Sequence, residues 1–169
     1  MAKLNIDTPP TKGRLEHRDD PGQQLEFHFN PEQLNVRSTA AWVKHPIAGI
    51  FDPRLQYAGG EGQEIDFRLQ LIHDPEGADI DIDEQIRWLE SLVFPNIAGS
   101  SIAHREAPRL RLFFGDGRGA YGVVVDQVDV IQRLFYRDLR TRYAEIELKL
   151  IVDRVQARGW QDVRSTRGS

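Results

Sequence analysis

The chain contains no cysteine. That absence excludes a disulfide framework, a thiolate zinc site, an iron–sulfur cluster and a cysteine nucleophile. Long apolar runs are also missing, since stretches such as Val123 to Val125 fall far short of the about 20 residues that span a bilayer. The segment before residue 23 lacks the apolar stretch of a secretory signal, so we expect a soluble protein.

What is present favours one globular domain. The chain has 169 residues, of which 40% are hydrophobic and 28% are charged, a balance typical of folded rather than disordered proteins. A length of this order suits a single domain with a core of its own.

Acidic and basic residues are separated along the chain, although the net charge is only −4. Residues 1–60 carry seven acids and seven bases, whereas residues 61–104 carry ten acids against Arg68 and Arg87, for −8. Residues 105–169 carry thirteen bases and nine acids, for +4. This separation suits head-to-tail contact between identical copies, and scattered solvated charge is the alternative interpretation.

Alternation of apolar and polar residues predicts a mainly β protein. The expected strands cover residues 25–29, 34–42, 65–71, 110–114, 121–130 and 144–152. Beyond Asp126 the alternation changes phase, which indicates a β-bulge. Strands joined by short turns favour antiparallel pairing and an α+β or barrel-like body.

One helix is expected between the strands. Apolar residues from Ile86 to Val93 recur at helical spacing, and Pro95 ends the run. An acidic turn over residues 74–83 leads into it, and Asp81 with Glu84 fits a capping box.

The remaining segments predict the domain boundaries. Residues 1–22 are rich in proline and charge and are expected to form a flexible arm, followed by one domain over residues 23–155. Residues 156–169 are expected to form a basic tail. Residues 45–53 predict a long loop with an apolar tip, and the glycines at 59–62 are expected to mark the start of the next strand.

The sequence patterns that could indicate a cofactor or a metal site are explained better as parts of strands, turns and the helix cap. Residues 117–122 match a dinucleotide fingerprint, but that motif needs a following helix, and residues 121–130 have the pattern of a strand. Asp79, Asp81 and Asp83 resemble a calcium loop that lacks the required central glycine. The five histidines lack the close spacing of metal ligands, so we expect no metal or cofactor.

Arginines and aromatic residues alternate in the basic segment 105–169, a pattern that can bind single-stranded nucleic acid. The neighbouring acidic segment argues against a strong binder. A small polyanion- or nucleic-acid-binding β module therefore remains the alternative function. An unrecognised hydrolase is a third interpretation, but no motif supports it, and we expect no enzyme activity.

An ordered set of short motifs covers residues 24–155. It begins with Phe27-x-Phe29-Asn30-Pro31, Trp42-x-x-His45-Pro46-x-x-Gly49 and Leu55-Gln56-Tyr57-x-Gly59-Gly60. It continues with Ala107-Pro108-Arg109-Leu110-x-Leu112-x-Phe114-Gly115, Tyr121-Gly122-Val123-Val124 and Arg140-x-Arg142-x-Ala144-x-Ile146-x-Leu148. This set resembles the tube-domain family of contractile injection systems and contractile phage tails, whose members often carry a LysM module.

The resemblance implies a tail-tube-like fold, which is a two-sheet barrel or sandwich of antiparallel strands with one α-helix. Such domains assemble as six-fold rings in which one sheet of each copy joins its neighbours around a lumen. A long hairpin or loop reaches an adjacent subunit or ring. By analogy the segment from Trp42 to Tyr57 would reach a neighbour, and the assembly interface would comprise Trp42, His45, Pro46, Ile47, Ile50, Phe51 and Tyr57.

The implied function is structural. A hexameric ring at the baseplate would join the spike or hub to the tail tube and initiate tube assembly. The implied partners are further copies of this chain, the tube protein, and spike, hub and other baseplate proteins, with no membrane and with nucleic acid only passing through the lumen. The implied location is the virion, or an injection-system particle in the host cytoplasm. The residues after Arg154 are too few for a LysM module, so the sequence leaves open whether the ring is the initiator, an adaptor or another tube-like ring.

Overall fold

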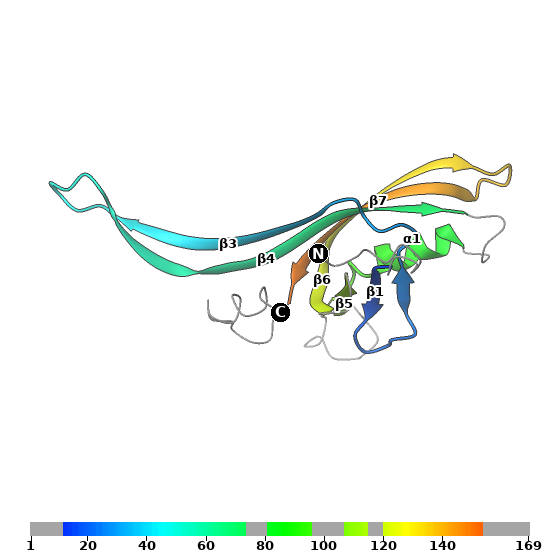
Figure 1. Cartoon of the computed structure of the whole chain (residues 1–169), viewed down its shortest axis with the longest axis horizontal. Coiled ribbons are helices and arrows are strands. Elements are labelled where there is room, and N and C mark those ends of the chain that lie inside the picture. The colour runs from blue at the N-terminus through cyan, green and yellow to red at the C-terminus, as the bar shows by residue number, and fades with distance from the viewer. Residues whose placement is uncertain (1–11, 74–80, 96–106, 115–119, 154–169) are drawn as a thin grey trace, which may run out of the picture.

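The computed structural model describes residues 12–73, 81–95, 107–114 and 120–153. Those residues form a mainly antiparallel β structure with one helix, as the sequence predicts (Figure 1). The elements are β1 (Arg14–His17), β2 (Gln24–Glu26), β3 (Leu34–His45), β4 (Arg54–Ile72), α1 (Ile82–Ser91), β5 (Leu110–Phe113), β6 (Ala120–Phe135) and β7 (Thr141–Val152).

All strands of the described ranges belong to one open sheet in the order β2-β1-β5-β6-β7-β4-β3. Every neighbouring pair is antiparallel. The expected two-sheet barrel or sandwich is therefore not confirmed for the single chain. The physical reason lies in β6. Its first part, from Ala120 to Val123, pairs with the short strand β5, and the part from Val123 to Phe135 pairs with the long strand β7, so one strand belongs to both regions.

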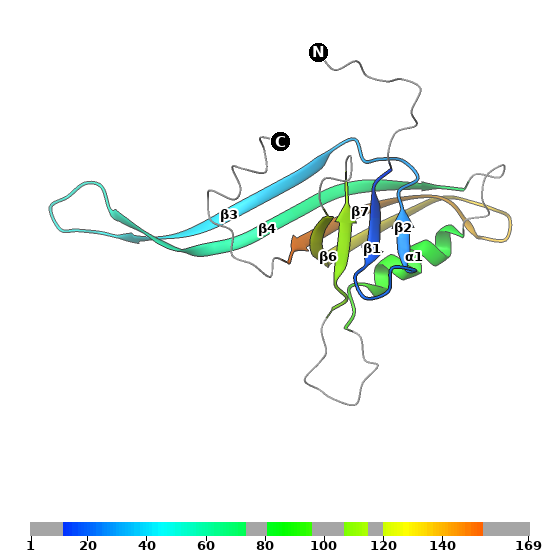
Figure 2. The ribbon, with the colours of Figure 1, turned by 60° about the horizontal axis from the view of Figure 1, so that its bottom comes forward.

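β6 changes register where the sequence predicts a bulge. The pairing of β6 with β7 shifts between Val125 and Gln127, which confirms the expected change of phase at Asp126. A bulge bends its strand and increases the local twist. Figure 2 shows β1 and the first part of β6 running across the direction of the long β3–β4 hairpin.

One hydrophobic core lies between α1 and the inward faces of the strands. The four apolar residues that alternate along β4 from Ile65 to Leu71 are almost completely buried, as is the matching series on β7. α1 contributes Ile82, Ile86 and Leu89 to the same cluster. α1 and the short strands lie on one side of the long strands, so the opposite, outer face of β4 and β7 carries the polar residues of the alternation (Figure 1).

Asp81 caps α1 as expected. Its Oδ1 accepts hydrogen bonds from the backbone N–H groups of Asp83 and Glu84, at 3.0 and 3.3 Å. These N–H groups have no partner within the helix, which is why an N-terminal carboxylate stabilises it. The rest of the predicted acidic turn, residues 74–80, lies outside the described residues.

The flexible arm predicted over residues 1–22 is wrong for residues 14–17. This segment is β1, which pairs with β2 and β5, and its Leu15 is fully buried. The adjacent Gly13 lies under the ring of Phe27, where a Cβ atom would come within 2.6 Å of Cδ2. A strand this short has no readable periodicity, so only its tertiary pairing identifies it. Residues 1–11 and the predicted basic tail lie outside the described residues.

The prediction that glycines 59–62 precede a new strand is also wrong. β4 runs through them without interruption and pairs with β3 from Arg54 to Phe67. The register shifts twice, between Thr39 and Ala40 and between Ala41 and Trp42. Gly59 and Gly62 have φ of +145° and +99°, conformations that glycine adopts easily, so these residues accommodate the bulges rather than end the strand.

Candidate assembly surfaces

The β3–β4 hairpin extends far beyond the body of the protein (Figure 1). β4 pairs with β7 only from Glu64 to Ile72, so the hairpin beyond Glu64 consists of two strands. A two-stranded hairpin without further packing is at best marginally stable in water. Within the described part of the chain, the distal hairpin therefore lacks the further strand that would stabilise it.

Trp42 and Tyr57 form an aromatic pair across this hairpin. They are register partners, and their rings meet edge to face with centroids 5.3 Å apart. Each side chain is more than half exposed despite its size. Leu55, two positions from Tyr57 on the same face, is equally exposed, and the sequence prediction did not include it.

The tip of the hairpin presents three apolar side chains. The N–H of Ile50 donates to the carbonyl of Ile47 at 3.1 Å, and Gly49 has φ of +80°. A positive φ at this position fits a type II turn, which explains the glycine. Phe51 follows the turn and is 99% exposed.

His45 and Pro46 mark the end of β3. Nε2 of His45 lies 2.8 Å from Oε1 of Gln56, which ties the two strands together near the tip. Pro46 lacks the N–H that a further ladder bond would need. The structure therefore brings all seven predicted interface residues into the distal half of one hairpin, and their contact with a neighbour stays a prediction.

The sequence prediction missed a second exposed apolar tip, on the β6–β7 hairpin at the other end of the molecule (Figure 1). Its exposed side chains are Ile131, Leu134, Phe135 and Leu139. The predicted strand ended at residue 130, whereas β6 continues to Phe135. The apolar run Leu134-Phe135-Tyr136 is a sequence signal for this tip. The arginines around it led instead to the alternative of a nucleic-acid-binding surface.

The β6–β7 tip holds its leucines in an uncommon backbone conformation. Leu134 and Leu139 have φ of 54° and 66°. For residues other than glycine this region costs about 1–2 kcal/mol per residue. Backbone hydrogen bonds between Tyr136 and Arg140, and between Leu139 and Tyr136, both 3.0 Å long, hold the turn. Arg140 also binds Asp138 at 2.6 Å, and this hydrogen bond lowers the pKa of the carboxyl group.

The long strands leave two unpaired edges. β3 is the last strand of the sheet order, so its outer side has no partner among the described strands. β5 covers β6 only from Ala120 to Val123, and no strand of the described ranges covers the outer side of Gln127–Phe135. Exposed edges of this length are templates for pairing with another chain.

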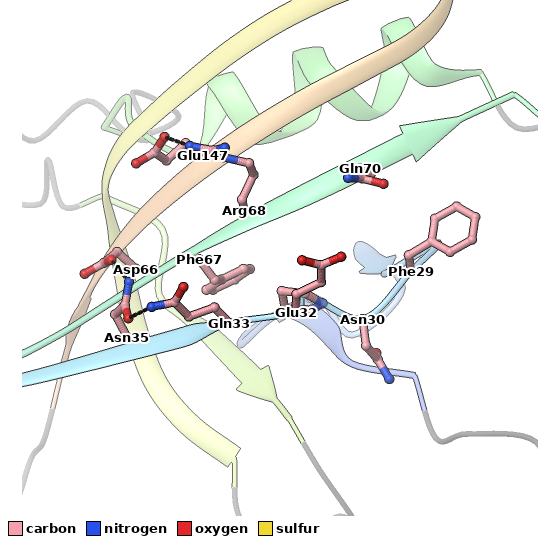
Figure 3. A pocket seen from close by; sticks show the side chains of 11 residues that line it. Phe29, Asn30, Glu32, Gln33, Asn35, Asp66, Phe67, Arg68, Gln70 and Glu147 are labelled. Atoms are coloured by element: carbon pink, nitrogen blue, oxygen red, sulfur yellow. Dashed lines mark hydrogen bonds and ion pairs between the residues drawn. The ribbon is translucent and has the colours of Figure 1, made fainter.

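A groove of about 530 Å³ opens beside the start of β3, between the connection at residues 29–33 and the outer face of β4 (Figure 3). Its lining includes the carboxylates of Glu32, Asp66 and Glu147. The one cation among the lining residues is Arg68, which pairs with Glu147 at 3.2 Å. The lining is therefore net acidic.

His28 lies beside this region, at the end of β4. Its Nδ1 accepts the N–H of Ile72 at 3.2 Å. Burial lowers the pKa of His28 below its ordinary value of 6.5. The folded structure therefore favours the neutral form of the His28 ring.

No helix in the described part of the chain is both long and apolar enough to cross a membrane. The same residues contain no group of three or more side chains suited to holding a metal ion. No protein-family model and no curated protein matches the chain.

Proposed function

We propose that this chain is a structural protein of a contractile phage tail or injection system. It forms a ring at the baseplate, with six copies by the family resemblance, that joins the spike or hub to the tail tube and initiates tube assembly. The observation that carries the proposal is the pair of long unpaired edges on β3 and β6.

The two edges are compatible with each other. β6, β7, β4 and β3 alternate in direction, so β3 of one copy and β6 of the next would meet antiparallel, and the alternation would continue across the joint. Because the two edges differ, the contact is heterologous, and heterologous contacts generate rings when the rotation closes. Closure into a ring would remove every exposed long edge.

In this proposal, several copies together form the barrel that the family resemblance implies. Each copy contributes four long strands, and the open sheet of the single chain becomes one segment of a continuous barrel around the lumen. The distal β3–β4 hairpin, with Phe51 at its tip, extends past the edge of its own sheet and supplies an apolar contact to an adjacent subunit or ring.

The mass of the purified protein across a concentration series tests this proposal. Light scattering should show species of about six copies, and negative-stain images should show rings. A chain that stays monomeric alone should form rings when mixed with candidate hub or tube proteins. A monomer under all of these conditions would overturn the proposal.

A polyanion-binding module is the second candidate. The β6–β7 tip gathers Arg133, Arg137, Arg140 and Arg142, and two of these guanidinium groups lie 5.9 Å from the ring centroid of Tyr136. This function predicts retention on a polyanion column and a steep loss of binding with added salt. Passage through the column at low salt would exclude it.

A further inference from the structure

The geometry of the two edges also places a specific contact in the ring. We propose that the β6–β7 tip of one copy docks in the acidic groove of the next copy. This inference depends on the proposed ring, because it specifies the joint between neighbouring copies.

The first step is the position of the two edges along the sheet. Val128, Leu148, Phe67 and Leu34 stand side by side across the four long strands. From this row β3 runs towards its hairpin tip, whereas the free part of β6 runs the opposite way, to Phe135. If two neighbouring copies stood at the same height along the strands, the free part of β6 would face very little of β3. The neighbour must therefore be displaced along the strands, towards the tip of the β3–β4 hairpin.

Barrel geometry gives the size of this displacement. Four strands are about 19 Å wide, and the usual strand tilt of about 35–45° in barrels then requires a stagger of about 13–19 Å per copy. At about 3.3 Å per residue, that is about four to six residues. The overlap falls on Leu34–Thr39, the part of β3 that precedes the first register shift.

The same displacement brings the neighbour's tip to the groove. Arg133 to Phe135 lie at and beyond the row of Ile72, five residues past the row of Phe67. A shift of about four to six residues places them level with the rows of the sheet that lie between Asn35 on β3 and Gln70 on β4. Both of these residues line the groove. Arg133 is opposite Tyr143 and pairs with Glu145, on the outer face that also carries Asp66 and Glu147. A continuous sheet therefore keeps this arginine of the tip and the groove on one face.

The chemistry of the two surfaces is complementary. The tip, residues 131–142, carries four arginines, of which Arg140 pairs with Asp138 and Arg133 with Glu145. The tip remains net basic, and the groove carries three carboxylates against Arg68. Leu134 and Phe135 would meet Phe29, which is half exposed at the end of the groove (Figure 3). Basic and apolar groups of the tip thus both find a counterpart. Such charge complementarity fixes the register of an interface.

A charge exchange tests the contact. Arg137→Glu and Glu32→Arg should each raise the midpoint concentration of assembly about tenfold or more, because like charges then face each other. An equal mixture of the two variants should assemble as the wild type does, since alternating copies restore an opposite pair at every joint. Asp19→Arg, in the exposed connection between β1 and β2, is the matched control and should assemble normally.

Disulfide trapping gives an independent readout, because the chain contains no cysteine of its own. The double variant Glu32→Cys with Arg137→Cys should form a ladder of covalent oligomers that ends at the closed ring. Asp19→Cys with Arg137→Cys should remain largely unlinked.

The two proposals fail differently. Rings of wild-type protein that are insensitive to both charge variants, with equal cross-linking in the two cysteine pairs, would overturn the tip–groove contact and leave the ring intact. A wild-type chain that never assembles, alone or with candidate partners, would overturn the ring and the contact together.

Discussion

At the scale of single residues, Asp83 joins the helix to the strands. Its carboxylate accepts hydrogen bonds from the N–H and the hydroxyl of Thr141, at 3.1 and 2.5 Å, and from Gln132 at 3.3 Å. Thr141 is buried, so its donors depend on this carboxylate. Asp83 therefore connects α1 to the turn end of the β6–β7 hairpin.

We expect Asp83→Ala to lower the free energy of unfolding by about 2–3 kcal/mol, because it leaves buried donors of Thr141 without an acceptor. Glu84→Ala is the matched control, since Glu84 lies in the same turn and is exposed, and it should cost less than about 1 kcal/mol. Urea denaturation measures both. Equal losses for the two variants would contradict the role of Asp83.

His28 makes the stability of the fold depend on pH. Burial lowers its pKa in the folded state, while the unfolded chain takes up the proton near pH 6.5. As the pH falls through 6.5, the unfolded state therefore binds more protons than the folded state, and the free energy of unfolding falls. The nearby charge of Lys12 also lowers the pKa, and that of Glu26 opposes it.

We expect the wild type to lose stability between pH 7.5 and pH 5.5 relative to His28→Gln, which keeps a polar side chain but cannot titrate in this range. Denaturation curves at several pH values would measure the difference. Stabilities that change in parallel for the two proteins would show that His28 does not contribute.

At the scale of elements, the two exposed hairpin tips stand apart from the core. The β3–β4 tip displays Ile47, Ile50 and Phe51, and the β6–β7 tip displays leucines in strained conformations. Neither arrangement stabilises the single chain. Both are understandable if the tips are covered in an assembly, because apolar surface removed from water contributes about 25 cal/mol per Å².

Phe51→Ser should separate stability from assembly. Phe51 is 99% exposed, so the free energy of unfolding should change by no more than about 0.5 kcal/mol. Assembly should weaken about tenfold or more, as for a central aromatic anchor. Phe94→Ser is the control, since Phe94 is 67% exposed just beyond α1 and lies outside the proposed interfaces. Normal assembly of Phe51→Ser, or an equal loss of assembly in Phe94→Ser, would contradict the assignment.

At the scale of the whole molecule, the sheet has two long free edges that face in opposite directions. β7 is paired on both sides from Tyr143 to Ile151, and β4 is paired on both sides from Glu64 to Phe67. β3 and the end of β6 have one partner each among the described strands. A molecule of this shape can extend its sheet on both sides. That property suits the proposed ring, in which each copy extends the sheet of the next.

Amide hydrogen exchange should detect the joint directly. In the monomer, outward N–H groups of Leu34–Thr39 and Gln127–Phe135 should exchange fast, because water is their only partner. In the assembly both segments should gain protection together, while the N–H groups of β7 stay protected throughout. Protection of only one of the two edges would contradict a heterologous strand joint.

Most strand positions, and the helix with its cap, can be predicted from the sequence alone. Alternation along residues 65–71 and 144–152, the change of phase at Asp126, and Asp81 before the helix are local patterns, and each was confirmed. The sequence also identified the apolar segment that forms the β3–β4 tip. These features depend on residues close together in the chain, so a linear reading can find them.

Which strands pair, and which edges stay free, can be seen only in the tertiary structure. β1 is recognisable only through its contact with β5, about a hundred residues away in the sequence, and β4 continues through its glycines because β3 pairs with it. The groove combines residues 29–33 with β4 and β7, and the second tip depends on the turn between β6 and β7. The physical reason is that sheet order and strand edges arise from long-range hydrogen bonds, which leave no periodic signal in the sequence.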